Sequence, residues 1–287
     1  MNPISGIRWK EKSRVVDVLL SSSDSIEAIP LAPGLEAEVT RIRLKGADYV
    51  LKVWNRSSKP SIENQYKLLQ ALFDRGLSVS EPLGWGLDNN NNQVLLTSFD
   101  GEPVRKVNKS LFAQIAKILT GIHKFPLEDL DESIVRKYDF VTYFYPRVEE
   151  HKDIHPLLLQ LVKQSQMKQD KLIHGDFNLG NILETAGRYT VIDWTNGQMG
   201  DPRYDLAWSI VLITVFVSER NGSIYRSALL AATRYEADEL ELFEAMACLR
   251  WVLLHRMFNL IKGKETAARV RNMLKKNIYL NESFLGL

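Results

Sequence analysis

The sequence predicts an α+β protein made of a strand-rich N-terminal part and a larger, mostly helical C-terminal part. Residues 1–98 contain paired segments in which polar and apolar residues alternate, as they do in β-hairpins. After the short connector "FDG" at 99–101, helical spacing of apolar residues dominates. A chain of 287 residues is long enough for two lobes around a cleft. We therefore expect an N-terminal lobe over 1–98 and a C-terminal lobe over 99–287.

The N-terminal part contains two hairpin signals separated by one helix signal. Residues 36–44 and 48–54 alternate on either side of the turn "KGA". Ser61 is suited to cap a helix that runs toward Gly76, a residue that commonly ends helices. An Asp/Asn-rich turn at 88–92 then joins "EPLGWGL" to "QVLLTSF", which predicts a second hairpin.

The C-terminal part begins with an amphipathic helix over 109–123. Between 172 and 193 the short apolar pieces "KLI", "NIL" and "YTVI" alternate with loops, which indicates a small sheet. From Pro202 onward we expect only helices. The apolar run "LAWSIVLITVFV" is twelve residues long, too short to span a bilayer, and predicts a core helix.

Composition excludes several classes of function. The net charge is only +2 and the basic residues are spread along the chain, so we expect neither a nucleic-acid surface nor a membrane surface. The single cysteine, Cys248, rules out an internal disulfide and fits a reducing compartment. The first residues lack the apolar core of a signal peptide. We expect a cytoplasmic protein.

Polar residues interrupt the apolar pieces between 172 and 193. The stretch "LIHGDFNLGN" contains Asp176 and Asn181, and Asp193 follows the apolar piece "YTVI". Aspartate and asparagine oxygens are ligands for Mg²⁺, and a separate carboxylate can accept a proton from a hydroxyl or orient it. Phosphoryl transfer needs this combination. It also needs a cation for the nucleotide phosphates, which Lys52 on the expected strand "YVLKVW" can supply, with Glu63 as its partner.

Four segments together resemble the aminoglycoside phosphotransferase and choline kinase family, relatives of the protein kinases. They are "HGDFNLGN" at 174–181, "VIDW" at 191–194, "GDPRYDLAW" at 200–208 and, more weakly, "YVLKVW" at 49–54. The resemblance implies a two-lobed protein-kinase-like fold with a small antiparallel sheet lobe and a larger helical lobe. It also implies an enzyme that uses ATP or GTP with Mg²⁺.

The resemblance assigns roles to individual residues near the reaction. It implies that Asp176 is the catalytic aspartate and that Asn181 and Asp193 bind Mg²⁺. His174 would support the loop through hydrogen bonds, and Asp205 would hold the loop's backbone. These last two are structural roles.

The resemblance also implies a nucleotide site in the N-terminal lobe. Lys52, paired with Glu63, would contact phosphates, and adenine would meet backbone groups near Thr97 and Phe99. The glycine-rich loop of protein kinases is reduced to the single Gly34, the positional counterpart of its phosphate-covering turn. Trp194, where protein kinases continue with Phe-Gly, favours the small-molecule branch.

The expected function is transfer of the γ-phosphoryl group of ATP or GTP to a hydroxyl of a small molecule. The shared phosphate machinery leaves the acceptor open among aminoglycosides, choline and other metabolites. It does not decide between antibiotic resistance and metabolism, nor does it give the oligomeric state. Two alternatives remain: a protein or lipopolysaccharide kinase, and a nucleotide-binding regulator without catalysis.

Overall fold

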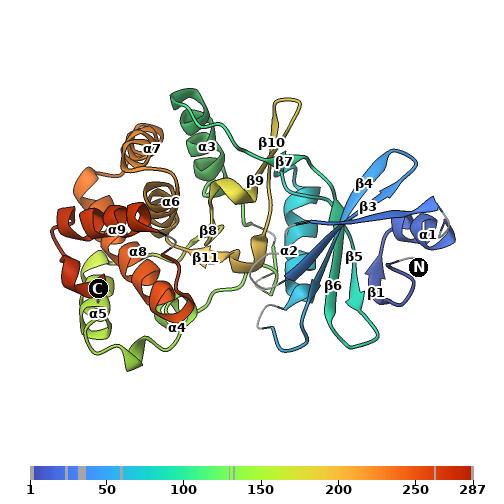
Figure 1. Ribbon diagram of the computed structural model, residues 1–287, viewed down its shortest axis with the longest axis horizontal. Helices are drawn as coiled ribbons and strands as arrows, with labels where there is room; N and C mark the ends of the chain where they lie inside the picture. Colours follow the sequence, from blue (N-terminus) through green and yellow to red (C-terminus); the bar gives the residue numbers. More distant parts are fainter. Residues whose placement is uncertain are drawn as a thin grey trace. The chain divides into compact units, whose positions relative to one another are not determined.

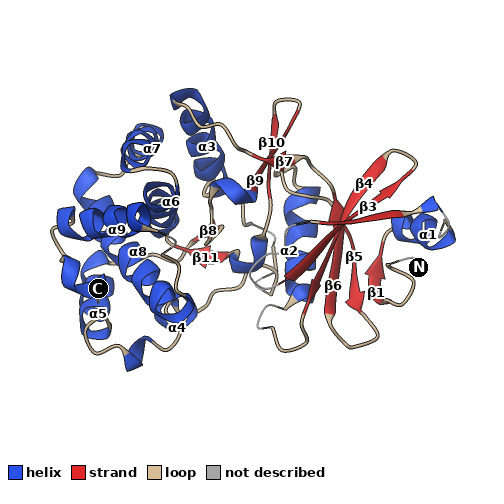
Figure 2. Cartoon of the chain, in the orientation of Figure 1, coloured by secondary structure: helices blue, strands red, loops and turns tan. Residues whose placement is uncertain are grey.

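The computed structural model describes residues 3–22, 25–31, 37–58, 61–128, 130–131, 133–261 and 263–285. The chain forms two compact units (Figures 1 and 2). The first comprises Met1–Pro103 and Ile182–Thr195, and the second comprises Val104–Asn181 and Asn196–Leu287. A short hairpin from the later part of the chain thus groups with the N-terminal residues.

The first unit is built on a six-stranded sheet in which every neighbouring pair is antiparallel. Its spatial order is β1-β5-β6-β4-β3-β2. The strands are β1 (Arg8–Lys12), β2 (Glu27–Pro30), β3 (Ala37–Leu44), β4 (Ala47–Trp54), β5 (Pro82–Leu87) and β6 (Gln93–Ser98). The two expected hairpins, β3–β4 and β5–β6, are confirmed, with Lys45 and Gly46 at the first turn.

The two faces of this sheet are covered by different helices. Helix α1 (Arg14–Ser21) lies on one side and α2 (Ile62–Asp74) on the other (Figure 1). Buried side chains of α1 form a core with alternate residues of β3, β4, β5 and β6, Leu51 among them. Since side chains alternate along a strand, Lys52 lies on the opposite face.

Helix α2 begins and ends as expected. Ser61 caps it, its hydroxyl accepting the N–H of Asn64 at 3.4 Å. Gly76, with φ +79°, follows its end. The buried side of the helix includes Gln65 and Tyr66.

A three-stranded sheet completes the first unit, in the order β10-β9-β7. Its strands are β7 (Glu102–Pro103), β9 (Ile182–Thr185) and β10 (Arg188–Val191). The Ser78 hydroxyl donates to the Tyr189 carbonyl at 2.6 Å, and the Val191 N–H donates to the Ser78 carbonyl at 2.9 Å. These bonds fix the end of β10, after which Asp193 follows.

The second unit is mainly helical, with a two-stranded sheet of β8 (Lys171–Ile173) and β11 (Gln198–Gly200). Helix α6 is buried along most of its length, as expected for the apolar run within it. Among the described residues, no helix is long and apolar enough to cross a membrane. The helices are α3 (Lys109–Ile122), α4 (Phe140–Phe144), α5 (His155–Ser165), α6 (Pro202–Phe216), α7 (Glu219–Ala232), α8 (Ala237–Phe258) and α9 (Lys264–Lys276).

The helices expected at 109–123 and after Pro202 are confirmed, and so is the α+β class. Cys248 is buried in α8, and its burial raises the pKa of the thiol. The cysteine therefore packs as a small apolar side chain.

Candidate active site

The loop at 174–181 follows β8, and its backbone requires glycine at position 175. Gly175 has φ +76°, in the left-handed region. A Cβ on this residue would lie 2.7 Å from the carbonyl oxygen of Asn196 and 3.3 Å from Cε1 of Phe144. The close approach of these neighbours leaves room for glycine alone, one residue before Asp176.

Asp205, in the first turn of α6, holds this loop by its backbone. Its Oδ1 accepts the N–H of Gly175 at 2.8 Å, and its Oδ2 accepts the N–H of His174 at 2.8 Å. The Nε2 of His123, at the end of α3, lies 3.0 Å from the same Oδ2. Burial alone would raise the pKa of Asp205, but the hydrogen bond from His123 and the two nearby imidazoles lower it overall. The ionised carboxylate can only accept, so it suits all three groups.

The Asp176 carboxylate is half-buried and held from two sides. The indole Nε1–H of Trp208 donates to Oδ1 at 2.9 Å. The Nδ2 groups of Asn178 and Asn181 lie 3.3 Å from Oδ2, and both also donate to the backbone carbonyl of Asp176. A carboxylate fixed in this way can align a hydroxyl or accept its proton.

His174 is fully buried within the loop. Its Nδ1 accepts the N–H of Asp176 at 3.2 Å, and its ring meets that of Phe177 edge to face. The ring therefore shapes the turn that carries Asp176.

In the first unit, Asp193 follows β10 with a strained backbone. Its φ is +63°, in the left-handed region that aspartate enters more readily than most residues. The Thr195 hydroxyl donates to its Oδ1 at 3.0 Å. Trp194 is buried beside it, its indole N–H donating to the Val191 carbonyl at 3.1 Å. Strain that is held by its surroundings is typical of functional positions.

Lys52 lies in the middle of β4, where it is paired in the sheet with Val39 and Leu95. Its ammonium group is 5.9 Å from the centre of the Trp54 ring. Among the described residues it makes no ion pair. The expected partner, Glu63, instead binds Lys67 one turn along α2 at 2.6 Å, and the Glu63 side chain is 44% exposed.

The expected Lys52–Glu63 pair is therefore absent, for a reason that lies in the helical period. Residue 63 follows the buried Ile62 by one position and so points away from the sheet. The polar residue that α2 buries is Gln65, three positions after Ile62 and only 5% exposed. Its Oε1 has no hydrogen-bond partner in the part of the chain described. Gln65 shares the buried face of Ile62 and Tyr66, so the helical period, not the charge of Glu63, indicates the polar residue that α2 turns inward.

Gly34, Thr97 and Phe99 are the other residues expected to contact the nucleotide. Gly34 lies outside the described residues. Thr97 is buried in β6, and the Phe99 N–H donates to the Asp48 carbonyl at 3.2 Å. The Arg41 guanidinium covers the Phe99 ring at 3.9 Å. Because the Phe99 N–H is already used, an adenine base would need other backbone groups of this segment.

The side chains expected to hold a metal, those of Asn181 and Asp193, offer oxygen ligands of the kind that Mg²⁺ takes. In the described ranges, no group of three or more His, Cys, Asp or Glu residues could hold a metal ion. Mg²⁺ does not require one, since it keeps several waters and takes other ligands from substrate phosphates and one or two side chains. The Nδ2 of Asn181 donates to the Asp176 carbonyl at 2.9 Å, so its Oδ1 is the atom of this amide that a metal could take.

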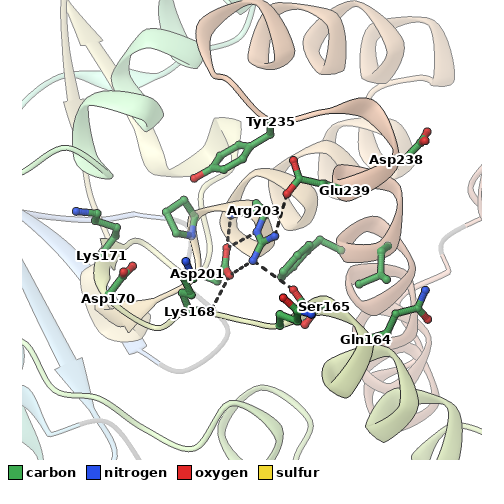
Figure 3. Close-up of a pocket in the computed structure, with 14 residues that line it drawn as sticks. Gln164, Ser165, Lys168, Asp170, Lys171, Asp201, Arg203, Tyr235, Asp238 and Glu239 are labelled. Carbon is green, nitrogen blue, oxygen red and sulfur yellow. Dashed lines mark hydrogen bonds and ion pairs between the residues drawn. The ribbon is translucent and has the colours of Figure 1, made fainter.

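The start of α6 serves the fold. Asp201 caps the helix, its carboxylate accepting the N–H groups of Arg203 and Lys168 at 2.9 Å each. Arg203 also binds Glu239 and the carbonyl of Ser165, and these residues line a cavity of about 640 Å³ (Figure 3). Arg203 is thus paired with both Asp201 and Glu239, and Asp176 is not among the residues that line this cavity.

The sequence matches the model of the phosphotransferase enzyme family over residues 27–249, and the chain belongs to this family. No curated protein matches the sequence. Solved structures share the fold at low identity. A Plasmodium vivax ethanolamine kinase is 17% identical, with a TM-score of 0.63 over 90% of this chain and 82% of that one.

Two further structures are similar to the same degree. The amicoumacin kinase hAmiN, solved with AMP-PNP, Ca²⁺ and Ami, is 16% identical, with a TM-score of 0.63 over 90% of this chain and 91% of that one. A thermostable mutant of the aminoglycoside phosphotransferase APH(4)-Ia is 16% identical, with a TM-score of 0.62 over 91% and 99%. The expected family, the kinase-like fold and phosphotransferase activity are thereby confirmed.

Proposed function

We propose that this phosphotransferase moves the γ-phosphoryl group of ATP or GTP to a hydroxyl of a small molecule. The observation that carries the proposal is the position of the Asp176 carboxylate. Trp208 fixes this carboxylate by a hydrogen bond, and Asp205 holds the backbone of the loop that carries it. The Asp176 carboxylate would align the acceptor hydroxyl and take its proton as the new O–P bond forms. Because the single cysteine fits a reducing compartment, we also propose the cytoplasm as the site of action.

The first unit would bind the nucleotide. The ammonium of Lys52 would contact the phosphates, and backbone groups near Thr97 and Phe99 would meet the base. Asn181 and Asp193 would hold Mg²⁺, which, when bound, neutralises phosphate charge. Most of the rate enhancement in such a reaction comes from positioning and electrostatics, so rigid carboxylates and amides are what the protein must provide.

The experiment is an ATP-consumption screen against a panel of hydroxyl compounds. Because related folds include ethanolamine and aminoglycoside kinases, the panel should contain amino alcohols, aminoglycosides and sugars. We expect at least one compound to stimulate ATP consumption. Asp176→Ala should lower that turnover by on the order of 10²-fold or more while nucleotide still binds.

The matched control is Asp238→Ala, which removes an exposed carboxylate from the first turn of α8. It should keep wild-type turnover. Near-normal turnover in Asp176→Ala would remove Asp176 from its role. Phosphate found on protein, with none on any small compound, would favour a protein kinase instead.

A further inference from the structure

The catalytic loop makes contacts with α6 and α8 that its proposed chemistry does not yet explain. Asp205 and Trp208 are three residues apart and therefore lie on one face of α6. Asp205 binds the loop's backbone, whereas Trp208 binds the Asp176 side chain through Nε1–H at 2.9 Å. Trp208 is 3% exposed, which agrees with a core residue, but its polar atom is directed at the carboxylate.

Arg250, in α8, contacts both the loop and this indole. Its Nη1 donates to the Gly175 carbonyl at 3.0 Å, on the peptide group next to Asp176. Its guanidinium carbon lies 4.1 Å from the centre of a Trp208 ring and 4.5 Å from the centre of the Phe144 ring. The cation is thus enclosed between two aromatic faces, an arrangement that guanidinium groups favour.

Burying this cation costs free energy that packing alone does not explain. Arg250 is 7% exposed, its Nε has no hydrogen-bond partner among the described residues, and none of their carboxylates forms an ion pair with it. Burial of an arginine without a carboxylate is unfavourable in proteins. An apolar side chain closer in length, such as methionine, would avoid this cost, so the contacts of the guanidinium need an explanation of their own.

We propose that Trp208 and Arg250 are positioning residues for the catalytic aspartate. Trp208 fixes the Asp176 carboxylate in one rotamer through Oδ1, while the amides of Asn178 and Asn181 contact Oδ2. Arg250 fixes the plane of the indole and, through the Gly175 carbonyl, the peptide group before Asp176. The cation over the indole also polarises its N–H and strengthens the hydrogen bond. This inference rests on the proposed catalytic role of Asp176.

The kinetic test compares two tryptophan variants. Trp208→Phe keeps an aromatic ring beside Arg250 and removes the donor to Asp176. Trp251→Phe is the matched control, because Trp251 is a fully buried neighbour in α8 whose Nε1 has no partner in the part of the chain described. Both variants lose similar packing, so they differ mainly in the hydrogen bond.

With an acceptor found in the screen, we expect Trp208→Phe to lower kcat on the order of tenfold or more, since small errors of alignment are costly. Its KM for ATP should stay within about twofold, because no nucleotide contact is lost. Trp251→Phe should keep the wild-type kcat. An unchanged kcat in Trp208→Phe, or an equal loss in both variants, would overturn the inference.

A second measurement does not depend on activity. The protein has six tryptophans, so their indole N–H signals can be resolved by ¹H–¹⁵N NMR, and the Trp208 signal is identified by its loss in Trp208→Phe. In Asp176→Ala this signal should move upfield and exchange faster with water, because its acceptor is gone. Arg250→Lys should shift it as well, since the contact between the guanidinium and the Trp208 ring is lost.

The two measurements separate the inference from the proposed function. A Trp208 signal that does not respond to Asp176→Ala overturns the inference whatever the acceptor screen gives. If the signal responds but the wild-type protein phosphorylates no compound, the hydrogen bond stands and the proposed function is what fails.

Discussion

Replacing Asp205 by asparagine tests how the catalytic loop is held. The carboxylate accepts two backbone N–H groups at 2.8 Å, one on each oxygen, and a third bond involves His123. An asparagine amide has one oxygen and one NH₂ group, so in either orientation a donor faces His174 or Gly175. At least one buried N–H then loses its partner. Hydrogen bonds to a charged group contribute roughly 1.5–3 kcal/mol each.

With one such bond lost and the others weakened by the loss of charge, we expect Asp205→Asn to lower the free energy of unfolding by about 2–4 kcal/mol. Urea denaturation followed by tryptophan fluorescence measures this change. The control is Asp170→Asn, which changes an exposed carboxylate on the loop that leads into β8 and should cost less than about 1 kcal/mol. A loss below about 1 kcal/mol in Asp205→Asn would refute the reasoning.

The pH dependence of stability follows from the same carboxylate. Its folded pKa is lowered below the ordinary value of 3.8. A lowered pKa means that the folded state binds the proton less readily than the unfolded chain does, so ionised Asp205 stabilises the fold above that value. The contribution should be lost as the pH falls through the folded pKa. The wild type should therefore lose more stability on acidification than Asp205→Asn does.

Three further predictions concern residues of the two units. Glu63→Gln should keep the KM for ATP within about twofold of the wild-type value, because Glu63 is exposed and binds Lys67. A tenfold rise in this KM would contradict the prediction and support a role for Glu63 in binding the nucleotide. Gly175→Ala should lower the free energy of unfolding by about 1–3 kcal/mol and reduce kcat, since its φ is +76° and its Cβ would meet Asn196; a wild-type denaturation midpoint would contradict this. Asp193→Asn should raise the Mg²⁺ concentration for half-maximal activity by roughly tenfold; an unchanged Mg²⁺ titration would count against the metal assignment.

Much of the fold could be predicted because its patterns are local. The hairpins β3–β4 and β5–β6 follow from alternation and turn residues, and Ser61 marks the start of α2 by its capping chemistry. Strand β1 gave no such signal, since "RWKEK" is almost wholly polar and mostly exposed. Its place in the sheet depends on pairing with β5, which is distant in the sequence.

The site could be predicted only as far as its motif extends. The loop 174–181 and the start of α6 can be recognised from runs of adjacent residues. A residue on another helix that contacts the loop cannot be recognised in this way. The charge of Glu63 suggests a partner for Lys52, but the helical period places Gln65 on the buried side of α2 instead. Arg250 lies far along the chain from Asp176 and joins the loop through tertiary packing alone. No spacing rule in the sequence connects the two.

The most direct test of the central claim is to follow the γ-phosphoryl group itself. The protein should be incubated with Mg²⁺, γ-labelled ATP and an acceptor from the screen, and the products separated and examined by ³¹P NMR. We expect the label in a phosphate ester on a hydroxyl oxygen of the acceptor, formed by the wild type and absent with Asp176→Ala. Label found only in inorganic phosphate, or an ester formed equally well by Asp176→Ala, would contradict the account.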